Sequence, residues 1–443
     1  MFESRRVHFV GIKGVGMSAL AQFFHCEGAL VAGSDTADEF PTDKNLLALG
    51  IIPLLFNEDN VKNDLDLVIY SRAYKQNHPE IQKAASLNIS LMDYGEALAC
   101  LFNRKKGIVV SGTHGKTTTT AMLGKIFEDA GLEPSVLVGG EVLDWQNNMR
   151  YGKGDFFIAE GDEYQEKFLN LKPEAVLITN IEYDHPDFFS DFKNYKNAFR
   201  KLVQKLDSNG ICAVREEDKD IFGDFKGKRI VFNSAMQKDI FNKLKLKVIG
   251  RHNRLNGLAA FMLARQFGIS ENSIFESLTE FQGIGRRLEH YNNPEDGILL
   301  IDDYAHHPAE IKAGINALRE AYPERKIAVA FQPHTFSRTE ALIDGFGRAF
   351  DGAHFIAIAD VYSSARENAG KITSKDLIKK LKERRLDVVY APTLSDVRDF
   401  FERVALTREA AGNEKYIFIT MGAGDIWEAA NRLKDRLCQN QHA

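Results

Sequence analysis

The residues best suited to chemistry form a loop that is bracketed by glycines and followed by a lysine and several threonines. An apolar run at 108–110 leads into Ser111-Gly112-Thr113-His114-Gly115-Lys116-Thr117-Thr118. The glycines let backbone N–H groups turn toward an anion, and a helix that begins near Lys116 adds its positive dipole end. The Lys116 ammonium can reach outer phosphates, and the Thr117 hydroxyl can hold Mg²⁺. The segment predicts a nucleoside triphosphate site, in a form shortened by Val110, where the common pattern has another glycine.

A second glycine cluster follows the first apolar run of the chain. Gly11, Gly14 and Gly16 lie between that run and a helical pattern, and Asp35 ends the next apolar run. This order is typical of a loop that holds a diphosphate, with Asp35 placed to bind a ribose. Lys13 occupies the middle glycine position of the dinucleotide pattern, which favours a diphosphate over a nicotinamide cofactor and places a positive charge at the loop. A tight turn without a ligand is the alternative.

Acidic and polar residues end the strands that are expected beside the phosphate loop. Glu160 ends one apolar run, and Asn180 and His185 follow the next. If these strands neighbour the loop, the Glu160 carboxylate faces a Mg²⁺ ion held by Thr117. His185 is a less natural ligand because Mg²⁺ prefers oxygen, and a structural histidine is the alternative. Asp162 and Glu163 are expected to be solvated and rank below Glu160.

Polar groups also cluster in the second half of the chain. Gly250-Arg251-His252-Asn253 precedes an apolar helix, where His252 and Asn253 either cap the helix or meet an adenine edge. Further on, arginines, aspartates and histidines recur at strand ends, in the segments 285–287, 302–308 and 331–338. Such groups suit a surface that binds phosphates and a carboxylate.

Along the chain, each short apolar run is followed by a glycine or polar cluster and then by a helical stretch. This alternation predicts an α/β fold with mainly parallel sheets and ligand sites at the carboxyl ends of the strands. The runs expected to be strands are 7–10, 156–159, 175–179, 298–301, 328–331, 355–359 and 417–420. Polar and glycine-rich boundaries divide the chain into expected domains at 1–103, 104–283 and 284–443, and the charged segment 215–247 is expected at the edge of the middle domain.

The composition is that of a globular protein, with 44% hydrophobic and 27% charged residues in 443. The formal net charge of −5 gives no basic surplus for nucleic acid or an anionic membrane. The chain shows neither a secretory signal nor an apolar run near the ~18 residues that a membrane span needs. Its four cysteines are far apart and are expected to be reduced thiols, so we expect a cytoplasmic protein.

Together these segments resemble the Mur ligases, the ATP-dependent amide-forming enzymes of bacterial cell-wall precursor synthesis. The resemblance extends along the whole chain and rests on several sequence motifs that occur in the same order as in the family. They are Gly14-Val15-Gly16-Met17-Ser18, Gly112 to Thr120, Gly250 to Asn253, Asp303-Tyr304-Ala305-His306-His307-Pro308, Phe331-Gln332-Pro333-His334 and Met421-Gly422-Ala423-Gly424-Asp425-Ile426. It implies a Rossmann-like amino-terminal domain, a central P-loop ATPase and a Rossmann-like carboxyl-terminal domain that closes over the site.

The resemblance also implies a role for individual residues. ATP would meet Gly112, Thr113, His114, Gly115, Lys116, Thr117, Thr118, Asn180, His252, Asn253, Arg287 and Asp302. The uridine-diphosphate substrate would meet Gly14, Gly16, Asp35 and Ser71, and the amino acid would meet Tyr304, His334 and Arg338. Mg²⁺ would be held by Thr117, Glu160 and His185, and the catalytic residues would be Lys116, Glu160, His185 and His307, the last as a base for the amine.

The implied reaction joins L-alanine to the carboxylate of UDP-N-acetylmuramate through an acyl phosphate and yields ADP and phosphate. A relative that recycles a ready-made tripeptide onto the same nucleotide is the alternative. We expect a monomer or homodimer with ATP and Mg²⁺ as cofactors. Two residues depart from the family pattern: Lys13 stands where glycine is usual, and Thr335 stands where alanine-adding members commonly have arginine.

Overall fold

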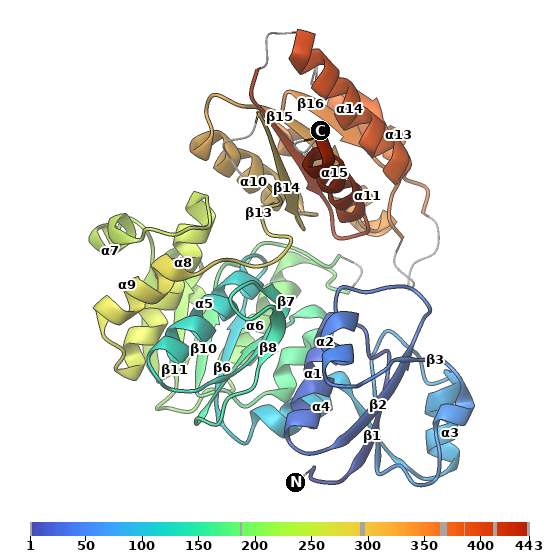
Figure 1. Ribbon diagram of the computed structural model, residues 1–443. Helices are drawn as coiled ribbons and strands as arrows, with labels where there is room; N and C mark the ends of the chain where they lie inside the picture. The colour runs from blue at the N-terminus through green and yellow to red at the C-terminus, as the bar shows by residue number, and fades with distance from the viewer. Residues whose placement is uncertain are drawn as a thin grey trace. The chain divides into compact units, whose positions relative to one another are not determined.

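The computed structural model describes residues 2–186, 188–292, 297–363, 370–384, 386–410 and 414–440. Three sheets, each mainly parallel, are flanked by helices (Figure 1), as the alternating pattern predicts. The chain forms two compact units. The first holds 1–184, 188–247 and 254–282, and the second holds the described residues of 185–187, 248–253 and 283–443. In the described part of the chain, no helix has the length and apolar character needed to cross a membrane.

The first sheet is entirely parallel, with the strand order β3-β2-β1-β4-β5. Its strands are β1 (Arg6–Val10), β2 (Leu30–Asp35), β3 (Leu54–Leu55), β4 (Leu67–Tyr70) and β5 (Ser90–Asp93). Its helices are α1 (Val15–Cys26), α2 (Asp43–Ala48), α3 (Pro79–Ser86) and α4 (Tyr94–Phe102), and a short 3-10 helix, η1, spans Glu58–Asn60. The central strand of this sheet is β1, and α1 follows it. The first glycine loop therefore lies at the carboxyl end of β1, as in dinucleotide-binding folds.

A buried carboxylate ties α3 to this sheet. Glu80 is fully buried and accepts hydrogen bonds from the Ser34 hydroxyl at 2.5 Å, the Asn57 N–H at 3.0 Å and the Asn60 amide at 2.8 Å. The Nε2 atom of buried His8 lies 3.3 Å from the same carboxylate. Burial by itself raises the pKa of Glu80, but these hydrogen bonds outweigh it and hold that pKa below the ordinary value.

The second sheet has the order β12-β11-β10-β6-β9-β7-β8. Its strands are β6 (Lys106–Ser111), β7 (Ser135–Val142), β8 (Asn147–Arg150), β9 (Phe156–Glu160), β10 (Ala175–Ile178), β11 (Ile211–Arg215) and β12 (Lys228–Phe232). The elements around it are α5 (Lys116–Asp129), η2 (Tyr164–Asn170), α6 (Phe192–Val203), η3 (Glu216–Phe222), α7 (Lys238–Lys243), α8 (Arg251–Ala264), η4 (Arg265–Phe267) and α9 (Glu271–Glu280). Strand β12 forms one edge, so the expected position of the charged segment 215–247 at an edge is confirmed.

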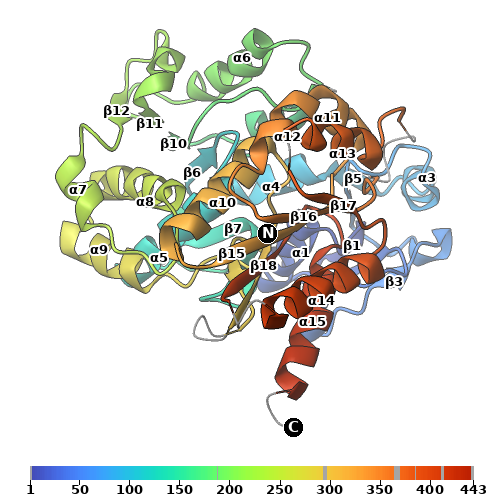
Figure 2. The ribbon, with the colours of Figure 1, turned by 90° about the horizontal axis from the view of Figure 1, so that it is seen from above.

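The third sheet has the order β13-β14-β18-β15-β16-β17, with only β13 antiparallel among its described strands. Its strands are β13 (Glu289–His290), β14 (Ile298–Asp303), β15 (Lys326–Phe331), β16 (Phe355–Ile358), β17 (Val388–Tyr390) and β18 (Tyr416–Met421). Its helices are α10 (Pro308–Ala321), α11 (Phe336–Ala341), α12 (Ile343–Ala349), α13 (Ser374–Lys382), α14 (Leu394–Ala410) and α15 (Trp427–Asn440). Helices α10, α12 and α13 lie on one face of this sheet, and α14 and α15 lie on the other (Figure 2). A separate apolar cluster packs between the sheet and each set of helices.

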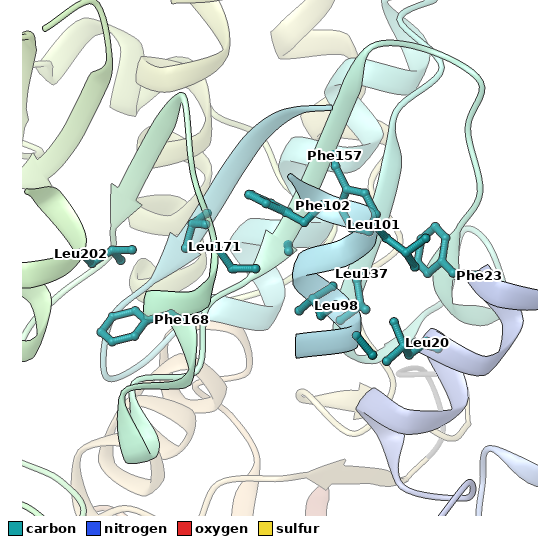
Figure 3. Close-up of a cluster of buried hydrophobic side chains, with 14 of the residues drawn as sticks. Leu20, Phe23, Leu98, Leu101, Phe102, Leu137, Phe157, Phe168, Leu171 and Leu202 are labelled. Carbon is teal, nitrogen blue, oxygen red and sulfur yellow. The ribbon is translucent and has the colours of Figure 1, made fainter. Parts of the chain in front are cut away.

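Every run expected to be a strand is a strand, and the phosphate-loop helix begins at Lys116 as predicted. The expected domain boundaries stay a prediction. The first two sheets share one apolar core within the first unit, in which Leu20 and Phe23 of α1 pack with Leu101 of α4, Leu137 of β7 and Phe157 of β9 (Figure 3). The Phe23 and Phe157 rings lie 5.1 Å apart. This core explains why the amino-terminal and central parts form one unit.

Amide side chains reinforce the contact between α1 and the β7–β8 hairpin. Buried Asn148 donates to the Val15 carbonyl at 2.6 Å and accepts from the Gln22 amide at 3.1 Å. Gln22 in turn accepts from Asn147 at 2.8 Å, and Asn147 accepts from Asn45 at 3.1 Å. We call these four residues, Asn45, Asn147, Gln22 and Asn148, the amide ladder.

Candidate functional site

The loop between β6 and α5 has the backbone that its glycines predict. Gly112 has φ of +132° and Gly115 has φ of +79°. A Cβ atom at Gly112 would lie 2.2 Å from the Thr179 hydroxyl, and one at Gly115 would lie 2.5 Å from the Asn256 amide oxygen. Both positions therefore require glycine for conformation and for space. The loop brings unpaired helix N–H groups to the carboxyl end of the sheet, which is an anion site.

Lys116 begins α5 and turns its ammonium back over the loop. The Nζ atom lies 2.5 Å from the Gly112 carbonyl, 3.1 Å from the Thr113 carbonyl and 3.0 Å from a Glu163 carboxylate oxygen. Burial lowers the pKa of Lys116, but Glu163 and Glu160 outweigh that effect and raise it above the ordinary value. Lys116 is thus a permanent cation in the loop. Contrary to expectation, Glu163 is not solvated, since it is 1% exposed.

Polar residues after β10 hold the loop from behind. The Asn180 side chain accepts from the His114 N–H at 3.0 Å and donates to the His114 carbonyl at 3.0 Å. The Thr179 hydroxyl donates to the same carbonyl at 2.6 Å, and the Thr113 N–H donates to the Asn180 carbonyl at 2.9 Å. Asn180, predicted to meet ATP, therefore shapes the loop with its side chain.

Two oxygen donors suited to Mg²⁺ lie in the first unit. Thr117 lies in the first turn of α5, and Glu160 ends β9, the neighbour of β6. One Glu160 oxygen accepts the Gly139 N–H at 2.9 Å. His185 has a positive φ of 56° and belongs to the second unit, so its predicted metal role stays a prediction. Among the described residues no group of three or more His, Cys, Asp or Glu side chains is arranged to hold a metal. Mg²⁺ needs few protein ligands because it keeps water and binds phosphates.

The first glycine loop uses its polar residues differently. Asp35 is buried, and its carboxylate accepts the Lys13 N–H at 2.7 Å and the Thr36 N–H at 2.8 Å. The Lys13 ammonium donates to the Asp38 carbonyl at 2.7 Å and lies 3.6 Å from the Asp43 carboxylate. Lys13 and Asp35 thus fix the loop's own shape, and the charge expected to face a diphosphate is held by neighbouring protein groups.

The remaining residues predicted for the uridine-diphosphate substrate lie at this loop. Gly14 is the N-cap of α1, and Gly16 is in its first turn. A Cβ atom at Gly16 would lie 3.0 Å from the Tyr94 ring. Ser71 is close to the loop as well, since its Cβ would be 3.3 Å from a Cβ at Gly11. The structure therefore brings Gly14, Gly16, Asp35 and Ser71 to one end of β1.

In the second unit, a cation and an aromatic ring gather beside His252. The Arg287 guanidinium lies 5.1 Å from the Tyr304 ring centroid and 3.7 Å from the Glu310 carboxylate. Burial and Arg287 lower the pKa of His252 to about 4, so this imidazole is neutral at neutral pH. The Asn253 amide donates to the Ile249 carbonyl at 2.8 Å, which ties the first turn of α8 to the chain just before it.

The aspartates and histidines at the end of β14 are held by protein partners. Asp302 is fully buried and accepts from Thr420 at 2.5 Å and from Arg286 at 3.0 Å. Burial raises the pKa of Asp303 to about 7 and lowers that of His306 to about 3. His307 is the N-cap of α10, and its Nδ1 accepts the Ala309 N–H at 3.2 Å. Nδ1 of His307 is thus engaged in capping α10, and the predicted role of His307 as a base stays a prediction.

The residues predicted to bind the amino acid follow two strands of this sheet: Tyr304 follows β14, and His334 and Arg338 follow β15, with β18 between the two strands. The His334 ring stacks on the Tyr362 ring with centroids 6.0 Å apart and lies 6.0 Å from the His306 ring. An Arg338 nitrogen is 3.4 Å from His334 Nδ1. Thr335 has a positive φ of 65°, an unusual conformation for a β-branched residue, and its N–H donates to the Tyr362 carbonyl.

Three groups at these sites were missed from the sequence: Glu163, Glu310, and Tyr195, whose hydroxyl lies 2.9 Å from that of Thr113. Glu163 could have been found because it directly follows a strand-end Glu-Gly-Asp, beside the predicted metal ligand. Glu310 is in the first turn of α10 and forms a capping box with His307, a local signal that could have found it. Tyr195 lies inside α6, where no local pattern distinguishes it from a core residue, and its role depends on tertiary contacts.

Comparisons with known proteins find one family along most of the chain. The Mur ligase family catalytic domain matches residues 6–106, the Mur ligase middle domain matches 110–264, and the Mur ligase glutamate ligase domain matches 286–424. The chain is 38% identical to UDP-N-acetylmuramate--L-alanine ligase of Desulfitobacterium hafniense, over 96% of this chain and 99% of that one. It is 34% identical to the protein of the same name from Sulfurihydrogenibium, over 99% of both chains.

A similar solved structure is that of UDP-N-acetylmuramate-alanine ligase from Thermotoga maritima, with a TM-score of 0.80, 29% identity and coverage of 98% of this chain and 99% of that one. A murein peptide ligase from Psychrobacter arcticus has the same fold, with a TM-score of 0.70, 21% identity and coverage of 97% and 98%. The family models and the full-length identities together show that the chain belongs to the Mur ligase family.

Proposed function

We propose that this protein joins L-alanine to the carboxylate of UDP-N-acetylmuramate at the expense of ATP, with ADP and phosphate as the other products. The observation that carries the proposal is the full-length identity of 38% to a relative with that activity in its name. The phosphate loop, the diphosphate loop and the carboxylate-binding groups at His334 and Arg338 supply a place for each of the three substrates.

The reaction needs activation because a carboxylate is a poor acyl donor. The muramate carboxylate attacks the γ-phosphate to form an acyl phosphate, and the neutral amine of alanine then displaces phosphate from that carbonyl. The first step brings two anions together. Lys116, as a permanent cation, and the N-terminus of α5 offset the repulsion and stabilise charge on the transferred group.

Thr117 and Glu160 would hold Mg²⁺, because a hydroxyl and a carboxylate are the oxygen donors that this ion prefers. Its charge would add to that of Lys116 at the phosphates. In the second unit, Arg287 and its Tyr304 partner would contribute a further cation, and Arg338 would pair with the carboxylate of the incoming amino acid. The acyl phosphate must be shielded from water, so we expect the carboxyl-terminal part to close when substrates bind.

Phosphate release tests the proposal. The protein is incubated with ATP, Mg²⁺ and UDP-N-acetylmuramate, and L-alanine, glycine, L-serine or the murein tripeptide is added singly. We expect release that depends on L-alanine. Release with the tripeptide alone would identify the recycling ligase instead. If no acceptor stimulated phosphate release, both functions would be contradicted. The glycine and serine arms measure how strictly alanine is preferred when Thr335 replaces the usual arginine.

A further inference from the structure

A buried tyrosine on α6 reaches the phosphate loop from behind. The Tyr195 side chain has no exposed surface, and its hydroxyl lies 2.9 Å from the Thr113 hydroxyl and 3.2 Å from Glu163 Oε1. Its ring is held in an aromatic cluster, with centroids 5.1 Å from Phe189 and 5.2 Å from Phe199. The hydroxyl therefore has a fixed position between the loop and the carboxylate that pairs with Lys116.

The Tyr195 and Thr113 hydroxyls each carry one proton, but each lies within hydrogen-bond distance of more than one acceptor. The Thr113 hydroxyl lies 2.8 Å from the Glu182 carbonyl, which can only accept, and it also accepts the Glu182 N–H at 2.8 Å. When Thr113 donates to that carbonyl, the single Tyr195 proton can go either to Thr113 or to Glu163. The Tyr195 hydroxyl is thus a donor with two alternative acceptors, one in the loop and one on the carboxylate.

The same carboxylate is the partner of Lys116. The Lys116 ammonium lies 3.2 Å and 3.0 Å from the two Glu163 oxygens. When the ammonium moves toward a phosphate, a carboxylate that is 1% exposed loses part of its compensation, and leaving a buried charge under-compensated is costly. Burial and the nearby Glu163 charge raise the pKa of Tyr195, so the hydroxyl keeps its proton and stays a donor.

We propose that Tyr195 is a positioning residue for nucleotide binding, whose hydroxyl donates to Glu163 when Lys116 turns from that carboxylate to a phosphate of ATP. The inference rests on the proposed function in taking ATP as the nucleotide. It predicts that Tyr195 acts through Glu163, so that its effect depends on the charge of that residue.

Tyr195→Phe tests the inference because it keeps the ring and removes the hydroxyl. We expect the Kd for ATP with Mg²⁺, measured by competition with a fluorescent ATP analogue, to rise about tenfold, the usual size for a lost hydrogen bond to a charged group. The KM for ATP is expected to rise equally, with kcat at saturating ATP within about twofold of the original. In a Glu163→Gln background, where the charge is absent, the same Tyr195→Phe change is expected to alter the Kd by less than about twofold.

Tyr322→Phe is the matched control, since it removes a hydroxyl that lies 3.1 Å from His290 Nε2, at a distance from the loop in sequence and in the second unit. It is expected to leave the Kd for ATP unchanged. An unchanged Kd in Tyr195→Phe, or an equal rise with and without the Glu163 charge, would overturn the inference. The binding measurement needs no acceptor amino acid, so a failure of the alanine-ligase proposal would be seen separately, in the phosphate-release assay.

Discussion

The two glycine loops of the first unit share a local plan, but they use their lysines in opposite ways. Each follows a central parallel strand, contains a positive-φ glycine and precedes a helix. Lys13 directs its ammonium to Asp38 and Asp43 and its N–H to Asp35, so it holds its loop together. Lys116 begins its helix and lies over the loop's own carbonyls, beside Glu163. A lysine near a glycine loop can therefore be held away from its loop by acidic neighbours, as Lys13 is, or lie over the loop at the start of the helix, as Lys116 does.

The largest expected effect on activity comes from removing the charge of Lys116 in the second loop. Lys116→Met removes the permanent cation at the site of phosphoryl transfer, and we expect kcat/KM for ATP to fall on the order of 10³-fold. Phosphate release measures the effect. Lys125→Met is the control, because Lys125 lies on the same helix and pairs with Asp129 at 2.6 Å, four residues away. A loss below tenfold in Lys116→Met would remove the distinction between the two lysines.

The next largest expected effect comes from replacing a glycine, which should reduce ATP affinity in the second loop but not in the first. Gly112→Ala forces a Cβ into a backbone with φ of +132° and to 2.2 Å from the Thr179 hydroxyl. We expect a loss of ATP affinity on the order of 100-fold, since such strain and the loop shift that relieves it cost a few kcal/mol. Gly14→Ala is the comparison, because Gly14 has φ of −56° and its nearest neighbour for a Cβ is 3.7 Å away. Its ATP affinity should stay within about twofold, and equal losses in both variants would contradict the argument.

Lys13→Met tests whether the first lysine is structural. We expect the free energy of unfolding to fall by about 1–2 kcal/mol, as a partly buried hydrogen bond and a nearby ion pair are lost. The KM for UDP-N-acetylmuramate should change by less than about threefold. Urea unfolding and steady-state kinetics measure the two quantities. A tenfold rise in that KM with unchanged stability would show instead that Lys13 reaches the diphosphate.

The smallest expected effect is on the pH dependence of stability. The contributions of Glu80 and Lys116 to the free energy of unfolding should be lost in opposite directions of pH change. The folded pKa of Glu80, under the first loop's sheet, is lowered, so its stabilising contribution is present above the ordinary carboxyl pKa of 4.5 and is lost as the pH falls through the folded value. The folded pKa of Lys116 is raised, so its contribution is present below 10.5 and is lost as the pH rises through the folded value. Glu80→Gln should therefore reduce the pH dependence of unfolding on the acid side, measured in urea between pH 3 and 7. An unchanged acid limb would assign that dependence to other carboxylates.

Sequence reasoning found the parts of the molecule that depend on local backbone chemistry. The strand runs, the helix start at Lys116 and the glycine positions follow from burial patterns and from φ angles that only glycine adopts readily. It placed Asp35 and Asn180 correctly at the ends of strands but did not predict their contacts within the loops, and the ligand roles of both residues stay predictions. Glu163 was expected to be solvated because a charged residue after a strand end is usually exposed, whereas the structure buries it between Lys116 of α5 and Tyr195 of α6. Contacts across 82 residues, such as Thr113 with Tyr195, have no local signature.

The amide ladder has a consequence for building hybrid enzymes from members of this family. Asn45 and Gln22 come from the amino-terminal part, and Asn147 and Asn148 come from the β7–β8 hairpin, so neither half of the ladder is complete without the other. A swap of residues 1–103 alone would set buried amides against unmatched partners, at the cost of unsatisfied polar groups. The natural unit of exchange is therefore the amino-terminal part together with the hairpin, because a crossover point between them would separate these hydrogen-bonded partners.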